Sequence, residues 1–273
     1  MSTIQAYTTA TRPTASASNV GLTIFNTTDK SINVSDGTNW RGYAYDSAYG
    51  WTGSSEYSLD FDGTDDYVEV QHSSSLNISG ALTISAWVYF DDLSGFPMIV
   101  NKRASTGHAY QFYSTSNKLA FTNGTAATST TSLSTNTWYH VAVVANSGTA
   151  TFYLNGSSDG SGSIASTMPT NTENVWLGGM SWASNYLNGR LDEVAIFNTA
   201  LNSTQIASMI SSNEPADLSS LSPVSWWRMG DNNGAGTATT LVDQGSGNNN
   251  ATIENGASGN TSPNYILGTP SHS

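Results

Sequence analysis

Cysteine is absent from this chain of 273 residues, so neither disulfide bonds nor thiol chemistry contribute to it. Charged residues are scarce, at 10% of the sequence, and only eight of them are basic. These eight are scattered along the chain, whereas nucleic-acid binding requires a clustered basic patch. The net charge of -12 therefore argues against nucleic acid as a partner, and it is compatible with divalent cations or neutral glycans.

A secretion signal and long apolar runs are also missing. The amino terminus has no basic segment followed by an apolar one, and no stretch of about 18 apolar residues occurs. We therefore expect a protein that is made in the cytoplasm and is not inserted into a membrane. If it acts outside a cell, another route delivers it, such as assembly into a virus particle that is released by lysis.

From residue 57 onward the sequence consists of short segments rich in Val, Ile, Phe, Tyr and Trp, separated by Gly, Asn, Ser or Asp. Such segments at a spacing of roughly 8 to 12 residues predict an all-β sandwich or jelly roll. The predicted strands are 81–90, 96–103, 109–114, 118–124, 137–146, 149–156, 174–179 and 189–198. One short helix is predicted after them, because Asn202 can cap it and Gln205 follows at the third position.

The first 50 residues form a different kind of sequence. Two predicted strands, 22–26 and 31–35, hold too few apolar residues to be stable alone. The triplet RPT, the segment GLTIFNTTD and the closing DGTNW follow in that order between Arg12 and Trp40. This order resembles a module of phage tail and fibre proteins. The resemblance implies a virion protein that forms a homotrimer, with residues 1–50 as a small β-meander for docking or trimerisation.

Five motifs carry a second resemblance over the region from Tyr57 to Ile210. In order they read YSLDFDGTDDYVEV, LTISAWVYF, NTWYHVAVVANSGTATFYLNGS, VWLGG and LNGRLDEVAIFNTALNSTQI. This order is similar to that of the laminin-G-like, concanavalin A-like jelly rolls, a group that includes pentraxins, lectins and carbohydrate-binding modules. The resemblance implies two packed antiparallel sheets, of which one is concave.

The carboxyl-terminal tail resembles the segment that usually opens such a domain, although here it follows the domain. Residues 223–257 contain an aromatic strand, a D-x-G-S-G-N turn and another short strand. We therefore expect residues 213–273 to fold back and complete one jelly roll that spans residues 51–273. Trp226 and Trp227 should point to opposite faces of their strand, so that at least one of them anchors the tail.

Catalytic patterns are missing. Glucan-hydrolysing relatives of this fold carry an E-x-D-x-E strand, whose alternation points two carboxylates into one cleft. This chain has six glutamates, and no two of them stand at that spacing. The four histidines show no metal-ligand or triad spacing, and no G-x-S-x-G occurs. We therefore expect no catalytic residues and no enzymatic activity.

An acidic cluster stands at the start of the second resemblance. Its aspartates are Asp60, Asp62, Asp65 and Asp66. Strand alternation places Asp60 and Asp62 opposite the apolar Leu59 and Phe61. Gly63 then begins a turn, and aspartate is favoured in turns because its side chain accepts hydrogen bonds from nearby backbone N–H groups.

Asp192 is expected on the side of its strand that carries Val194 and Ile196, where a carboxylate needs compensation. In relatives of the jelly-roll group the G-x-[IL]-D-E-V strand often runs beside the FDG strand, and the two hold a structural calcium ion. The resemblance thus implies calcium at Asp62, Gly63 and Asp192, since hard oxygen ligands suit this ion. The alternative is turn chemistry together with an ion pair to Arg190 or another cation.

The loop after the VWLGG motif contains two aromatic side chains, Trp182 and Tyr186. These residues are candidates for stacking on sugar rings, and the alternative is that they pack on a neighbouring loop or subunit. The loop lacks the acidic and amide residues that pentraxins have there, so calcium-dependent capture of the pentraxin type is not predicted.

Two functional hypotheses remain. The first is a non-enzymatic structural protein of a bacteriophage virion, a decoration, fibre or tail component that displays a lectin-like jelly roll toward host-surface glycans. It would contact other virion proteins and form a homotrimer. The second is a bacterial carbohydrate-binding module or adhesin. The missing secretion signal favours the virion.

Overall fold

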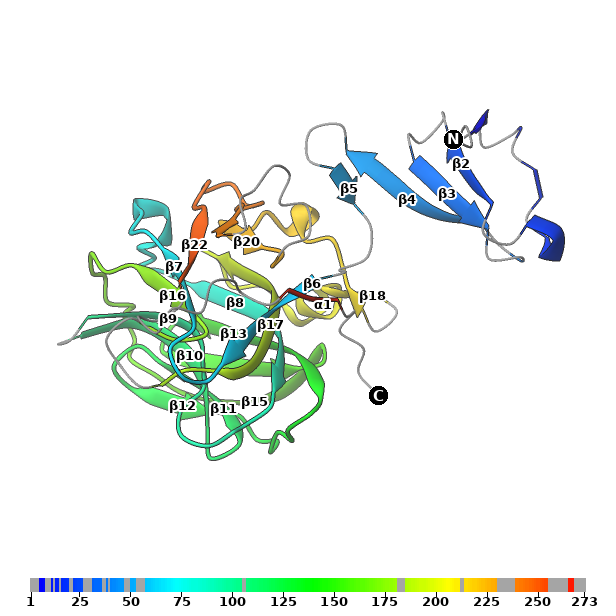
Figure 1. Ribbon diagram of the computed structural model, residues 1–273. Helices are drawn as coiled ribbons and strands as arrows, with labels where there is room; N and C mark the ends of the chain where they lie inside the picture. The colour runs from blue at the N-terminus through cyan, green and yellow to red at the C-terminus, as the bar shows by residue number, and fades with distance from the viewer. Residues whose placement is uncertain are drawn as a thin grey trace. The chain divides into compact units, whose positions relative to one another are not determined.

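The computed structural model of the protein describes residues 5–7, 11, 13–14, 16–19, 22–26, 31–35, 38, 40–46, 50–52, 57–104, 107–180, 185–211, 214–229, 239–254 and 265–267. The chain divides into two compact units, Met1–Gly53 and Ser54–Ser273 (Figure 1). The first unit contains one small sheet and the second contains a sandwich of two larger sheets.

The sheet of the first unit has five strands in the order β1-β2-β3-β4-β5. β1 runs parallel to β2, and the other neighbours pair antiparallel. The elements are β1 (Gln5–Tyr7), the 3-10 helix η1 (Ala17–Asn19), β2 (Thr23–Asn26), β3 (Ser31–Ser35), β4 (Trp40–Asp46) and β5 (Gly50–Thr52). β2 and β3 are the two strands that the sequence predicts in this region.

One sheet of the second unit is built around β8, and we call it the β8 sheet. In spatial order it contains β15 (Ser157–Ser163), β14 (Thr149–Leu154), β13 (Trp138–Asn146), β8 (Leu82–Phe90), β17 (Asn188–Phe197), β6 (Tyr57–Asp62) and β23 (Tyr265–Leu267), with β20 (Ser225–Trp227) also paired to β17. All of its neighbouring strands pair antiparallel.

The other sheet of the second unit is built around β9, and we call it the β9 sheet. In spatial order it contains β12 (Ala126–Thr128), β11 (Lys118–Thr122), β10 (Gly107–Thr115), β9 (Met98–Ala104), β16 (Val175–Leu177), β7 (Tyr67–Val70), β22 (Ala251–Glu254) and β21 (Thr240–Leu241). The remaining elements are η2 (Ser74–Leu76), α1 (Ser203–Ala207), the pair β18 (Ile210–Ser211) and β19 (Glu214–Pro215), and η3 (Ser219–Leu221).

An apolar core fills the space between these two sheets. The alternation along β7 is typical: Val68 and Val70 are completely buried, whereas Tyr67 and Glu69 are half-buried on the other face. The predicted fold class, an all-β antiparallel sandwich of the jelly-roll type, is confirmed. No helix in the described parts of the chain is both long and apolar enough to cross a membrane.

A second apolar cluster covers the outer face of the β8 sheet. Ala142 from the sheet packs there with Ile206 of α1 and with Met209 beyond it. The predicted helix cap is confirmed, because the Asn202 side chain accepts the N–H of Gln205 at 2.9 Å and the Gln205 side chain accepts the N–H of Asn202 at 3.0 Å.

Strands from the tail belong to both sheets of the sandwich. β20 pairs with β17, β22 pairs with β7, and β23 pairs with β6. Trp227 lies in the core between the sheets and Trp226 lies in the outer cluster on the β8 sheet, so they point to opposite faces as predicted.

A single carboxylate fastens the tail at its centre. Asp243 is buried, and it accepts hydrogen bonds from the Ser225 hydroxyl at 2.9 Å and from the N–H of Trp226 at 2.8 Å. The N–H groups of Gly245 and Asn249 also donate to it, each at 2.7 Å. This is the D-x-G-S-G-N turn of the sequence, and its aspartate joins β20 to the turn that precedes β22.

A β-bulge in β17 overturns one sequence prediction. Asp192 stands opposite Trp87 in β8, whereas Ala195 stands opposite Ser85, so β17 contains one extra residue. Glu193 takes up the bulge with a φ of +50°. The expectation that Asp192 shares the side of Val194 and Ile196 is wrong, because the bulge shifts the alternation and leaves Asp192 on the outer face with Trp87.

Candidate functional site

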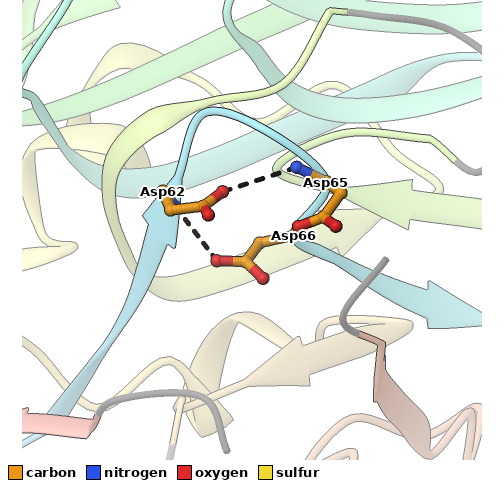
Figure 2. Close-up of side chains that lie close together, drawn as sticks. All are labelled: Asp62, Asp65 and Asp66. Atoms are coloured by element: carbon orange, nitrogen blue, oxygen red, sulfur yellow. Dashed lines mark hydrogen bonds between the residues drawn. The ribbon is translucent and has the colours of Figure 1, made fainter. Parts of the chain in front are cut away.

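The acidic turn between β6 and β7 is closed by its own carboxylates (Figure 2). Asp62 accepts hydrogen bonds from the N–H groups of Thr64 at 2.7 Å and of Asp65 at 3.4 Å. Asp66 accepts one from the N–H of Asp62 at 3.0 Å. The predicted alternation is confirmed, because Leu59 is buried in the core while Asp62 is exposed.

Negative charge is concentrated at this turn. One carboxylate oxygen from each of Asp62, Asp65 and Asp66 lies within 4.8 Å of the other two. Partial burial raises the pKa of Asp66, and the neighbouring carboxylates raise it further, against the effect of the hydrogen bond from the N–H of Asp62. Three hard oxygen donors gathered this closely are suited to a divalent cation such as Ca²⁺.

Asp60 does not belong to this group of carboxylates. It forms an ion pair with Arg190, at 3.3 Å, and the Arg190 guanidinium also lies 4.6 Å from the centre of the Tyr89 ring. Partial burial raises the pKa of Asp60, and Arg190 opposes this rise. Asp60 is thus engaged in the outer surface of the β8 sheet.

Asp192 lies apart from the turn, so the predicted set of Asp62, Gly63 and Asp192 does not form one site. Asp62 stands opposite Asn188 in the register of β6 and β17. Asp192 is four residues further along β17, which corresponds to about 13 Å along a strand. The resemblance predicts that these two strands are neighbours, and their register depends on contacts that no local pattern marks. The residue that meets Gly63 is Asn188, whose Cβ would lie 2.7 Å from a Cβ at that glycine.

Tyr186 approaches the acidic turn from the loop after β16. A Cβ at Gly179 would lie 2.5 Å from the Tyr186 ring and 3.0 Å from the backbone carbonyl oxygen of Asp66. Burial raises the pKa of the Tyr186 hydroxyl, and the charge of Asp65 raises it further. Tyr186 is therefore a half-buried aromatic ring near the backbone carbonyl oxygen of Asp66, at the edge of the acidic turn. Trp182, the other predicted binding residue, lies outside the described residues.

A row of polar and aromatic side chains crosses the outer face of the β9 sheet. Cross-strand neighbours in this row are Thr252, Glu69, Trp176, Asn101, Gln111 and Thr122. No sequence motif singled out the amides of this row. Trp176 is only 3% exposed, although it points away from the core between the sheets.

The segment after β16 links this row to the acidic turn. Gly178 has a φ of +74°, and a Cβ there would lie 2.2 Å from the ring of Phe61. Two residues later the Met180 sulfur lies 3.3 Å from the amide nitrogen of Asn101. The chain therefore passes close to Phe61 and Tyr186 and continues directly onto the outer face of the β9 sheet.

The architecture defines the class of protein, a lectin-type β-sandwich. Residues 62–207 match the family model of the concanavalin A-like lectin/glucanases superfamily, of the laminin G type. The match spans just over half of the chain, and the protein belongs to this family. No curated protein matches the chain significantly.

Solved structures share the fold at low sequence identity. A candidate carbohydrate-binding protein of Bacteroides ovatus is 16% identical, with a TM-score of 0.60 over 82% of this chain and 66% of that one, just under two thirds of its length. A pentraxin of Limulus polyphemus is 17% identical, with a TM-score of 0.47 over 58% and 83%. Domain 4 of a Geobacillus stearothermophilus arabinanase, solved with arabinotriose, is 18% identical, with a TM-score of 0.46 over 63% and 82%.

Proposed function

We propose that the second unit is a non-enzymatic domain that recognises glycans. The observation that carries this proposal is the position of Tyr186 near the backbone carbonyl of Asp66, at the turn where the carboxylates of Asp62, Asp65 and Asp66 gather. An aromatic ring offers a flat apolar surface to the C–H face of a sugar, and carboxylates accept hydrogen bonds from sugar hydroxyls. The lectin-type fold and the candidate carbohydrate-binding protein of B. ovatus support the same function.

The engagement of buried carboxylates in structural contacts supports a role without catalysis. Glu193 accepts hydrogen bonds from the Trp226 indole and, at 2.9 Å, from Arg228 Nε. Asp243 is held by four donors in the tail. A catalytic acid and base must instead face a substrate across a cleft.

A glycan array with bacterial surface glycans and neutral oligosaccharides tests this proposal. We expect binding by the intact protein and a loss of affinity of about tenfold or more in Tyr186→Ala. Tyr89→Ala is the matched control, because Tyr89 is also a half-buried tyrosine but lies on the outer face of the β8 sheet. Equal affinities of the Tyr186 variant and the intact protein would contradict a site at this position.

We also propose a structural calcium ion at the acidic turn. Its ligands would be the carboxylates of Asp62, Asp65 and Asp66, together with the backbone carbonyl of Gly63. The cluster of oxygens within 4.8 Å and the raised pKa of Asp66 support this proposal, because a cation would offset the charge that the fold gathers there. Calcium should raise the melting temperature, and a chelator should lower it.

We further propose that the first unit attaches the glycan-binding unit to a larger assembly, such as a bacteriophage virion, as a homotrimer. Its compactness as a separate unit with its own five-stranded sheet supports this role. Light scattering on the full chain should give the mass of a trimer, and removal of residues 1–53 should give a monomer. A full-length monomer that binds glycans would instead favour a bacterial carbohydrate-binding module or adhesin.

A further inference from the structure

Two buried amides on the outer face of the β9 sheet have thioether sulfurs as the partners of their amide nitrogens. Asn101 is completely buried, and its Oδ1 has no hydrogen-bond partner in the described part of the chain. Its amide nitrogen donates to the Met180 sulfur at 3.3 Å. In the neighbouring strand Gln111 is 3% exposed, and its amide nitrogen has the Met98 sulfur at 4.0 Å. The side-chain oxygen of Gln111 has a better partner, His108 Nδ1 at 2.6 Å, so the amide nitrogen is the group left with a weak acceptor.

Such an arrangement is unfavourable for an amide that is purely structural. Thioether sulfur is a weak acceptor, and nearly all buried amide groups in proteins have oxygen or nitrogen partners. Asn123 in the same protein shows the usual case. It is 1% exposed, it accepts the N–H of Ala165 at 3.0 Å, and it donates to the carbonyls of Ala165 and Thr167 at 2.9 and 3.2 Å.

The two amides lie side by side in the centre of the polar row. Asn101 stands opposite Gln111 on one side and opposite Trp176 on the other. Adjacent strands lie about 4.8 Å apart, so the row from Thr252 to Thr122 extends over about 24 Å. The two amides are flanked by the indole ring of Trp176 and by the thioether side chains of Met98 and Met180. From Met180 the chain leads toward Tyr186.

We propose that Asn101 and Gln111 form a subsite for the hydroxyl groups of a neutral oligosaccharide, and that the side chains of Met98 and Met180 occupy this subsite until the sugar displaces them. The inference rests on the proposed glycan recognition and extends its site from the acidic turn onto the face of the β9 sheet. A sugar hydroxyl both donates and accepts, so it can bond to the Asn101 oxygen and to the Gln111 amide at once.

The chemistry of the surroundings selects the kind of ligand. Both amides are uncharged, and the net charge of -12 disfavours acidic sugars. The nearest carboxylate in the row, Glu69, is already engaged by the side-chain amides of Gln71 at 3.0 Å and Asn174 at 2.9 Å. Methionine is suited to a temporary occupant, because its unbranched side chain changes rotamer readily and its sulfur gives up only a weak hydrogen bond.

Methyl NMR on the full-length protein tests the displacement directly. The chain has six methionines, so labelling their ε-methyl groups with ¹³C gives few signals. We would titrate neutral gluco-, xylo-, arabino- and galacto-tetrasaccharides. We expect the signals of Met98 and Met180 to shift with bound sugar, while Met209, in the cluster under α1, serves as the internal reference and stays unchanged.

A pair of asparagine variants separates a binding role from a structural one. Asn101→Leu should reduce affinity for the tetrasaccharide about tenfold or more, without lowering the melting temperature, because it removes polar groups that lack good partners. Asn123→Leu is the matched control, and it should lower the melting temperature but retain sugar binding. If Asn101→Leu lowered the melting temperature and Asn123→Leu did not, the inference would be overturned even before a sugar is tested.

The outcomes also distinguish the inference from the proposed function. If a tetrasaccharide binds and Tyr186→Ala loses affinity, while the Met98 and Met180 signals stay fixed and Asn101→Leu binds normally, glycan recognition stands and the subsite is refuted. That result would mean that ordered water molecules provide the missing hydrogen bonds of the two amides. If no tetrasaccharide binds, both the subsite and recognition of these neutral glycans are refuted.

Discussion

Replacing Asp243 with alanine should remove about 3 to 5 kcal/mol from the stability of the sandwich. The carboxylate is buried and accepts four hydrogen bonds of 2.7 to 2.9 Å. A hydrogen bond to a charged group contributes about 1.5 to 3 kcal/mol, but the bonds share one group and are not additive. The estimate is a large part of the roughly 5 to 15 kcal/mol that a domain has. β20 and β22, which flank this turn, should therefore detach from their partner strands β17 and β7 first.

Urea denaturation followed by tryptophan fluorescence measures this loss, because Trp226 and Trp227 lie in the strand that Asp243 fastens. We expect a much lower midpoint with a similar slope. Asp217→Ala is the control, since Asp217 is exposed and accepts one hydrogen bond, from the N–H of Ser219 at 2.8 Å. A loss below about 1 kcal/mol, no larger than that of the control, would refute the reasoning that this carboxylate anchors the tail.

Three further predictions concern charge and backbone. Burial and neighbouring carboxylates raise the pKa of Asp66, so Asp66→Asn should melt higher than the intact protein at neutral pH without calcium, and calcium should stabilise only the intact protein. Burial lowers the pKa of Lys102 to about 8, so the unfolded chain holds more protons above that pH; urea midpoints should rise from about pH 8 to about pH 10, and Lys102→Met should abolish the rise. Gly178→Ala should lose about 2 to 4 kcal/mol in urea unfolding through its positive φ and a clash with Phe61, whereas Gly107→Ala, with open space around it, should lose little.

Local sequence signals determined the strands and the helix of the second unit. Leu59 and Asp62 fall on the predicted faces of β6, because the alternation of a strand has a fixed period of two. The cap of α1 was predictable from Asn202 and Gln205, since both halves of a capping box lie within four residues. In each case the interacting groups are neighbours in the chain.

Contacts that depend on register could not be predicted in the same way. The side of Asp192 was predicted wrongly because the bulge at Glu193 adds one residue, and nothing in the local pattern marks it. The opposition of Asn188 to Asp62 likewise depends on how two distant strands slide against each other. The amide row on the β9 sheet was missed for the same reason, since Asn101 and Gln111 stand in separate strands and become neighbours only through the register of β9 and β10.

The two outer faces of the sandwich differ in a way that bears on function. The outer face of the β8 sheet carries apolar side chains, such as Ala142 and Phe197, which must be covered to be stable, and α1 with the following segment covers them. The outer face of the β9 sheet carries Trp176, Asn101 and Gln111 in one row, and a polar row of this kind is favourable only where hydroxyl or amide partners reach it. The tail strand β22 lengthens this second sheet and places Thr252 beside Glu69 at the end of the row. The fold-back of the tail therefore serves both faces: it completes the cover on one, and on the other it extends the surface that a glycan would contact.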